Sequence, residues 1–187
     1  MTARVSRTYD YDGRTTDVAQ MMAMPGIDYL RGILRGDFPG APIASTLGFT
    51  LAEVEPGHAV FTGVPQRFVY NPLGGVHGGW AATLLDSAMG CAVHTTLPAG
   101  KGYTTVDLHV HLVRGLSEKS GSIRCEAQVI HAGGSIATAQ GRIVDADGTL
   151  YAHGTTTCLI LTPGAPARTP DRPDIGTEAP ATPSQGR

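Results

Sequence analysis

The sequence predicts an α+β domain in which one antiparallel sheet curls around a single long helix. Two strand-like runs precede a long apolar helical segment, and four more follow it with turn-rich connections. A single helix inserted into a series of strands favours one sheet that wraps this helix over alternating layers of strands and helices. The length of 187 residues, 41% of them hydrophobic, suits one such domain with terminal segments.

Residues 1–40 are predicted to form an N-terminal extension that is partly helical. Asp17 is suited to cap a short helix that Pro25 ends, and a second short helix is expected over residues 27–34. A linker rich in Pro and Gly follows, and it cannot continue a helix. We therefore place the start of the main domain just after Pro39.

The main domain, residues 41–162, carries six predicted strands. They are Leu47–Glu55, His58–Pro65, Thr104–Val113, Ser122–Ala132, Ser135–Val144 and Thr149–Leu161. Pro56-Gly57 forms the turn of a hairpin between the first two. Because the later connections are rich in turn residues, we expect consecutive strands to be antiparallel neighbours.

The remaining composition limits the class of protein. A net charge of -2 without a basic stripe argues against a nucleic-acid partner, and no apolar run approaches the roughly 20 residues that span a bilayer. Without a signal-like N-terminus, we expect a cytoplasmic protein with no membrane partner. Cys91, Cys125 and Cys158 lie far apart, which fits reduced thiols rather than a disulfide framework. Residues 163–187 are rich in Pro and Ala and predict a disordered tail.

The stretch from Asn71 to Val93 carries the strongest functional signal. Its apolar residues recur at helical spacing around almost the whole circumference, which predicts a buried helix. Asp86 is the one carboxylate in this helix, and no Lys or Arg between Asn71 and Gly100 can pair with it. Burying an unpaired carboxylate is costly, so Asp86 is the first functional candidate. The alternative is that Asp86 faces a polar loop or caps a neighbouring element.

The glycine-rich turn before this helix supplies hydrogen-bond donors. At a helix N-terminus the amides of Gly78, Gly79 and Trp80 have no acceptor in a preceding turn, and such amides can polarise a carbonyl and hold an oxyanion. His77 lies at the same helix end. Along an ideal helix it is about 13 Å from Asp86. A site shared between two subunits would bring the two groups together.

Asn71, the G-x-V-H-G-G run from Gly74 to Gly79, and Asp86 together resemble the motif of the PaaI-like, or phenylacetate-pathway-type, acyl-CoA thioesterases. The order of strands and helix likewise resembles their hotdog fold, from about Thr46 to Leu161. This resemblance implies a homodimer or a dimer of dimers, with each active site built from both subunits.

The resemblance also implies roles for individual residues. Asp86 would act as general base or nucleophile on the thioester, and the amide of Gly78 would polarise its carbonyl. Polar groups near that carbonyl would be His77 and Asn71. Thr105 would position the attacking water, with the adjacent Thr104 as the alternative, since a one-residue shift exchanges the two faces of a strand.

Substrate contacts are predicted in two places. Phe68, Tyr70 and Trp80 are candidates for the acyl pocket, although aromatic residues there are equally ordinary core. The amide of Gly79, like that of Gly78, is a candidate for holding the oxyanion of the substrate. A tight turn is a candidate for binding the phosphates of coenzyme A, helped by a basic side chain. The residues in question are Gly133, Gly134 and Ser135 with Arg114 or Arg124. The alternative for these glycines is a plain β-turn.

Asp107, His109 and His111 alternate along one predicted strand. This pattern resembles a metal-ligand spacing, but no second cluster completes the coordination shell. A polar outer face or a subunit contact is favoured, and we expect no metal.

The sequence therefore predicts an acyl-CoA thioesterase that releases free coenzyme A and a carboxylic acid, with no cofactor beyond the coenzyme A of its substrate. Aryl and medium straight-chain acyl groups both remain open. One alternative is a non-catalytic acyl-CoA-binding hotdog module. The third choice is a hotdog enoyl-CoA hydratase, which is disfavoured because Phe68, Val69 and Tyr70 precede Asn71 where that family places an Asp.

Overall fold

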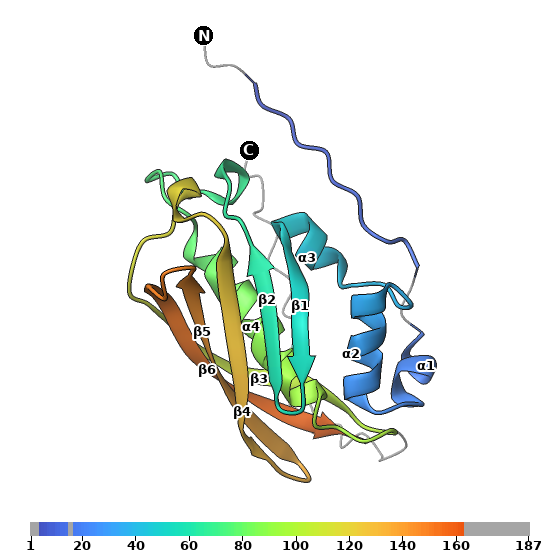
Figure 1. Cartoon of the computed structure of the whole chain (residues 1–187). Coiled ribbons are helices and arrows are strands. Elements are labelled where there is room, and N and C mark those ends of the chain that lie inside the picture. The colour runs from blue at the N-terminus through green and yellow to red at the C-terminus, as the bar shows by residue number, and fades with distance from the viewer. Residues whose placement is uncertain (1–3, 15–16, 163–187) are drawn as a thin grey trace, which may run out of the picture.

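The computed structural model describes residues 4–14 and 17–162 (Figure 1). The predicted tail, residues 163–187, lies outside the described residues. Within the described part, no helix is both long enough and apolar enough to cross a membrane.

Six strands form one antiparallel sheet that curves around the helix α4 (Gly78–His94), as Figure 1 shows. The strands are β1 (Phe49–Glu55), β2 (His58–Gly63), β3 (Gly102–Leu112), β4 (Ile123–Ala132), β5 (Ile136–Asp145) and β6 (Leu150–Leu161). Their order across the sheet is β1-β2-β4-β5-β6-β3. The predicted α+β architecture with a wrapped central helix is confirmed.

The expectation that consecutive strands are neighbours is correct for β1–β2, β4–β5 and β5–β6 but wrong for β3–β4. β3 pairs with β6, and β4 pairs with β2. The connection from β3 to β4 is not a hairpin turn, since it contains the short 3-10 helix Glu118–Ser120 with Ser117 as its cap. A connection of this length lets the chain cross from one sheet edge to the middle.

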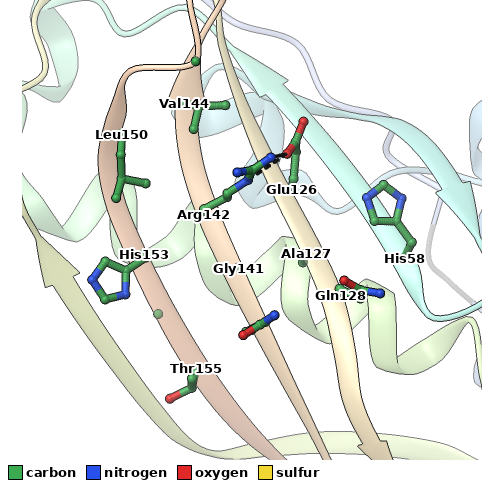
Figure 2. A pocket seen from close by; sticks show the side chains of 13 residues that line it. His58, Glu126, Ala127, Gln128, Gly141, Arg142, Val144, Leu150, His153 and Thr155 are labelled. Atoms are coloured by element: carbon green, nitrogen blue, oxygen red, sulfur yellow. Dashed lines mark hydrogen bonds and ion pairs between the residues drawn. The ribbon is translucent and has the colours of Figure 1, made fainter.

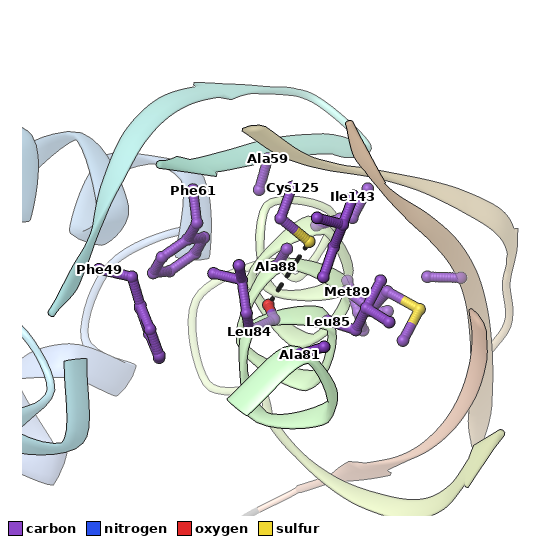
Figure 3. Packing of buried hydrophobic residues seen from close by; sticks show 14 of the residues in the cluster. Phe49, Ala59, Phe61, Ala81, Leu84, Leu85, Ala88, Met89, Cys125 and Ile143 are labelled. Atoms are coloured by element: carbon purple, nitrogen blue, oxygen red, sulfur yellow. Dashed lines mark hydrogen bonds between the residues drawn. The ribbon is translucent and has the colours of Figure 1, made fainter. Parts of the chain in front are cut away.

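Helix α4 packs on the concave face of the sheet through fully buried apolar side chains (Figure 3). Leu84, Leu85 and Met89 have no exposed surface. The helix lies close to β5 because Gly141 has no side chain: a Cβ there would lie 3.1 Å from both Leu85 and Met89. The thiol of Cys125 on β4 lies 3.6 Å from the carbonyl oxygen of Leu84.

One side of α4 differs from the prediction of a helix buried all round. Thr83, Asp86, Ser87 and Cys91 recur at helical spacing and are all partly exposed. The sheet covers the remaining circumference of the helix. The exposed stripe arises because the two sheet edges, β1 and β3, do not meet over it.

Three short helices precede the sheet: α1 (Val18–Met22), α2 (Gly26–Arg35) and α3 (Pro42–Leu47). The Asp17 carboxylate accepts hydrogen bonds from two amides of α1, which confirms it as the N-cap. Helix α2 begins against the end of α4, where a Cβ on Gly26 would lie 2.0 Å from the carbonyl oxygen of His94. The amide of Gly26 also donates to the carbonyl of Leu97 at 3.0 Å. The N-terminal helices are therefore packed on the core of the domain.

Candidate active site

Asp86 and Thr105 form the central polar pair of the candidate site. The hydroxyl of Thr105, on β3, donates a hydrogen bond of 3.0 Å to Oδ1 of Asp86, in the third turn of α4. Thr104 is exposed, whereas Thr105 is partly buried. Successive side chains of a strand point to opposite faces, so Thr105 rather than Thr104 faces Asp86.

Asp86 and Thr105 line a pocket of about 410 Å³, here called the Asp86 pocket. Its polar wall includes Ser87, whose hydroxyl donates to the carbonyl of Thr83 at 2.8 Å. Most of the remaining lining is apolar, although Ser45 and Thr50 add two hydroxyl groups. The large apolar side chains come from α2, β1 and β2: Leu30, Ile33, Leu34, Phe49, Leu51 and Phe61. Among the lining residues, Asp86 is the one ionisable carboxylate. A carboxylate with an oriented hydroxyl beside an apolar pocket can activate water next to a bound apolar group.

Cys91 lines the same pocket but is not a suitable nucleophile. Burial, with a smaller contribution from the negative charge of Asp86, raises the pKa of Cys91 to about 12. The thiol is therefore protonated at neutral pH, and the thiolate is the reactive form of cysteine. Among the residues that line the pocket, Asp86 stays the candidate for the reactive group.

At the start of α4 we predicted free amides at Gly78, Gly79 and Trp80, but two of the three have acceptors in the structure. His77 caps the helix with its own ring, because Nδ1 accepts a hydrogen bond of 2.9 Å from the amide of Gly79. The amide of Trp80 donates to the carbonyl of His77, also at 2.9 Å. The prediction that Gly79 offers its amide to substrate is therefore wrong for this conformation. Gly78, at the first helical position, has no helical acceptor before it.

Gly78 lies against the edge strand β3. A Cβ at this position would come within 2.6 Å of Cδ1 of Leu112. Gly78, His77, Leu112 and Arg114 line a second pocket, of about 220 Å³, called the helix-start pocket. Asp86 does not line it. Within one chain, the structure does not bring His77 and Gly78 together with Asp86.

Asn71 organises the glycine-rich loop. Its side-chain oxygen accepts from the amides of Leu73, at 2.9 Å, and Gly75, at 3.3 Å. The backbone closes the same turn, since the amide of Gly74 donates to the Asn71 carbonyl and Gly74 has a φ of 85°. Asn71 thus holds the loop that leads to His77 and α4.

Two aromatic candidates for the acyl pocket, Trp80 and Tyr70, make hydrogen bonds to other parts of the domain. Trp80 is 3% exposed, and its ring nitrogen donates to the carbonyl of Leu47 at 2.8 Å. It packs edge-on against Phe49 in the core. The hydroxyl of Tyr70 accepts from the amide of Glu118 at 2.7 Å. Neither residue lines the Asp86 pocket within one chain, so their contact with the acyl group stays a prediction.

The residues predicted to bind the phosphates of coenzyme A do not lie together within one chain. Gly133, Gly134 and Ser135 form the turn between β4 and β5, beside the end of β6, where the Ile160 amide donates to the Ser135 carbonyl. Arg114 donates its amide to Tyr151, near the start of β6. The two groups therefore lie at opposite ends of β6. Arg124 is held by Glu53 at 2.7 Å and Glu126 at 3.2 Å.

The face of the sheet away from α4 is polar (Figure 2). A depression of about 650 Å³ lies over β4, β5 and β6 and contains the ion pair between Arg142 and Glu126, 2.8 Å apart. The three residues of the predicted D-x-H-x-H strand pattern pair locally: His109 lies 3.2 Å from Asp107, and His111 stacks on His153. Among the described residues, no group of three or more His, Cys, Asp or Glu side chains is arranged to hold a metal.

Sequence reasoning missed the contribution of α2 to the Asp86 pocket. Leu30, Ile33 and Leu34 line it from the N-terminal extension. Their spacing is that of one helix face, which was visible in the sequence. The pattern alone did not indicate which part of the domain this face contacts.

Comparisons with known proteins bear on the family and the fold of this chain. Residues 73–152 match the family model of the thioesterase superfamily. A Halobacterium salinarum protein provisionally described as an esterase is 37% identical over 73 residues, which are 38% of this chain and 46% of that protein. The match thus spans less than half of this curated relative.

Two solved structures share the fold. A phenylacetic acid degradation-related protein of Ralstonia eutropha, provisionally described as a thioesterase, is 29% identical with a TM-score of 0.64, covering 70% of this chain and 98% of that one. A Streptococcus mutans protein solved with bound acetyl CoA is 20% identical with a TM-score of 0.56. The match covers 62% of this chain and 90% of that one. The chain therefore has the hotdog fold, and its residues 73–152 are similar to the thioesterase superfamily. It also resembles the PaaI-like proteins, as the motif around His77 and Asp86 predicted.

Proposed function

We propose that this protein hydrolyses acyl-CoA thioesters to free coenzyme A and a carboxylic acid. The observation that carries the proposal is the hydrogen-bonded pair of Asp86 and Thr105 at the wall of an apolar pocket. Acetyl CoA bound to the Streptococcus mutans protein of the same fold supports a coenzyme A thioester as the ligand. The reaction needs no cofactor beyond the substrate.

A complete site requires a second copy of the chain. β3 is a terminal strand of the sheet, so one of its edges has no strand partner within the described residues. The partly exposed stripe of α4 lies beside it. An open strand edge is a template for pairing with another chain. In a homodimer of this kind, Asp86 of one subunit acts with Gly78 of the partner subunit.

The chemistry then follows from the two halves of the site. Asp86 takes a proton from water, and the water oxygen attacks the thioester carbonyl carbon. The amide of Gly78 of the partner subunit donates to the developing oxyanion, aided by the positive end of its helix. The C–S bond breaks, the thiolate of coenzyme A leaves and is protonated, and the acid is released. Thr105 fixes one oxygen of Asp86, so the other remains for the water.

The test is release of free thiol from acyl-CoAs by the wild type and by Asp86→Asn. Removing a general base should lower kcat by roughly 10²- to 10⁴-fold. Ser87→Ala is the matched control, because Ser87 lines the same pocket one residue away and its hydroxyl bonds only to its own helix backbone. Equal turnover by Asp86→Asn and the wild type would refute the mechanism.

A non-catalytic acyl-CoA-binding module is the second candidate, and the apolar walls of the Asp86 pocket favour it as well. The same assay separates the two functions. Saturable binding of acyl-CoA without turnover, in wild type and variant alike, would assign binding alone.

A further inference from the structure

The N-terminal helices form a wall of the Asp86 pocket. Leu30, Ile33 and Leu34 of α2 and Ala44 of α3 line this pocket together with Asp86 and Thr105, and none of these four residues carries a polar side chain. The lining from α2 is thus wholly apolar, whereas Ser45 of α3 and Thr50 of β1 add hydroxyl groups elsewhere in the lining. An acyl group with its carbonyl at Asp86 would point its hydrocarbon part towards α2 and α3.

A second apolar groove, of about 630 Å³, adjoins the Asp86 pocket. Its lining includes Val18, Met21 and Met22 of α1, and Leu161 at the end of β6. We call it the α1 groove.

The two hollows share three lining residues: Ile33 of α2, Ala41 before α3, and Tyr103 of β3. These residues form the boundary between them. Tyr103 is fixed from behind, since its ring packs on α4 where Gly90 leaves room for it: a Cβ there would lie 2.7 Å from the Tyr103 hydroxyl. Ile33 belongs to α2 of the N-terminal extension, and Ala41 directly precedes α3.

The size of the first hollow argues for an extended acyl group. A cavity of about 150 Å³ is enough to bind benzene. The Asp86 pocket, at about 410 Å³, exceeds this more than twofold, so a single aryl ring would leave much of its apolar wall uncovered. An alkyl chain can fill the pocket and continue past Ile33 into the α1 groove.

We infer that the substrate carries a long unbranched alkyl acyl chain, and that Ile33 of α2 and Ala41, the residue before α3, set the chain length accepted. This inference rests on the proposed function and deepens it. The chain lies along the Asp86 pocket, passes Ile33, and ends among the methionines of α1.

The first measurement is kcat/KM for acetyl-, hexanoyl-, dodecanoyl- and phenylacetyl-CoA with the full chain. Between the acetyl and dodecanoyl compounds, kcat/KM should rise by up to about fourfold per methylene buried, and phenylacetyl-CoA should be a poorer substrate than dodecanoyl-CoA. A profile that favours acetyl- or phenylacetyl-CoA would overturn the inference.

The second measurement uses Ile33→Trp and Ala41→Phe, which fill the boundary from α2 and from the residue before α3. Each should lower kcat/KM for dodecanoyl-CoA by about tenfold or more and leave hexanoyl-CoA within about twofold. Ile130→Trp, at a β4 position that is 57% exposed, is the matched control and should leave the chain-length profile unchanged. Equal losses for both chain lengths in the boundary variants would contradict the assignment.

Binding separates this inference from the proposed reaction. Hexyl- and dodecyl-CoA thioethers cannot be hydrolysed, and calorimetry should give tighter binding of the dodecyl compound by wild type and loss of that preference in Ile33→Trp. If this binding preference is found but no acyl-CoA is hydrolysed, the proposed hydrolase activity is refuted and the inferred alkyl-chain pocket is supported. If acyl-CoAs are hydrolysed but the two thioethers bind equally tightly, the hydrolase activity is supported and the alkyl-chain inference is refuted.

Discussion

The hydroxyl of Thr105 donates to Oδ1 of Asp86 across 3.0 Å, and this bond joins the edge strand β3 to the central helix α4. The two residues are 19 positions apart in the chain. The bond fixes the orientation of the Asp86 carboxylate. Asp86 would otherwise rotate about its side-chain torsions at a partly exposed position.

Replacing Thr105 tests this positioning. Thr105→Val keeps the shape of the side chain and removes the donor, so kcat should fall by about 10- to 100-fold, the scale of a hydrogen bond to a charged group. KM should change little, because the apolar walls of the pocket stay intact. Thr105→Ser restores the hydroxyl and should recover most of kcat. Steady-state kinetics of the three proteins are the measurement, and loss of activity in Thr105→Ser as well would assign Thr105 a packing role.

Gly78 is expected to be sensitive to an added side chain, although its neighbour Leu112 is 57% exposed and can move. In Gly78→Ala the new Cβ would lie 2.6 Å from Cδ1 of Leu112, so the start of α4 or the Leu112 side chain must move. We expect kcat/KM to fall by up to about tenfold, to the extent that the helix start rather than Leu112 moves and displaces an oxyanion donor. The double variant Gly78→Ala/Leu112→Ala should recover part of the loss. Gly75→Ala is the control, since its nearest neighbour would be 3.8 Å away.

The contact between α2 and the end of α4 should be sensitive to volume. In Gly26→Ala the added Cβ would meet the carbonyl oxygen of His94 at 2.0 Å, and a backbone atom cannot turn aside as a side chain does. The free energy of unfolding should fall by about 2 kcal/mol or more. Urea denaturation measures it, with Gly115→Ala as the control because no heavy atom lies within 4 Å of that position. Equal stabilities would show that α2 is displaced at little cost.

His94 should make stability depend on pH. It is 6% exposed beside the rings of Tyr29 and Tyr103, and burial lowers its pKa below the usual 6.5. The unfolded chain therefore binds a proton at a pH where the folded protein does not. Stability from this group is complete above pH 6.5 and declines as the pH falls below that value, by at most about 1.4 kcal/mol per pH unit.

Urea denaturation at pH 8, 6.5 and 5.5 measures this effect. His94→Gln removes the titrating group, so the difference in unfolding free energy between wild type and variant should shrink as the pH falls. A constant difference over that range would exclude His94 as the cause.

Local patterns in the sequence were sufficient for the six strands and the central helix. They did not predict the 3-10 helix Glu118–Ser120, and the strand expected from Leu47 begins at Phe49 because Leu47 ends α3. The three- and four-residue spacing of apolar residues predicted α4, Asp17 predicted the cap of α1, and Pro56-Gly57 predicted the first hairpin, because each depends on neighbours in the chain. The unpaired carboxylate of Asp86 was visible in the same way, as a charge within an apolar helix.

The tertiary structure alone decided which distant groups meet. The pairing of β3 with β6 presents Thr105 rather than Thr104 to Asp86. The ring of His77 accepts the hydrogen bond from the amide of Gly79. Packing of α2 against the end of α4 brings Ile33 to the Asp86 pocket. Such contacts depend on how elements pack and on the path of long connections, whose entropy varies only slowly with length. Sequence periodicity fixes which face of a helix is apolar, but the packing of the whole chain fixes what that face covers.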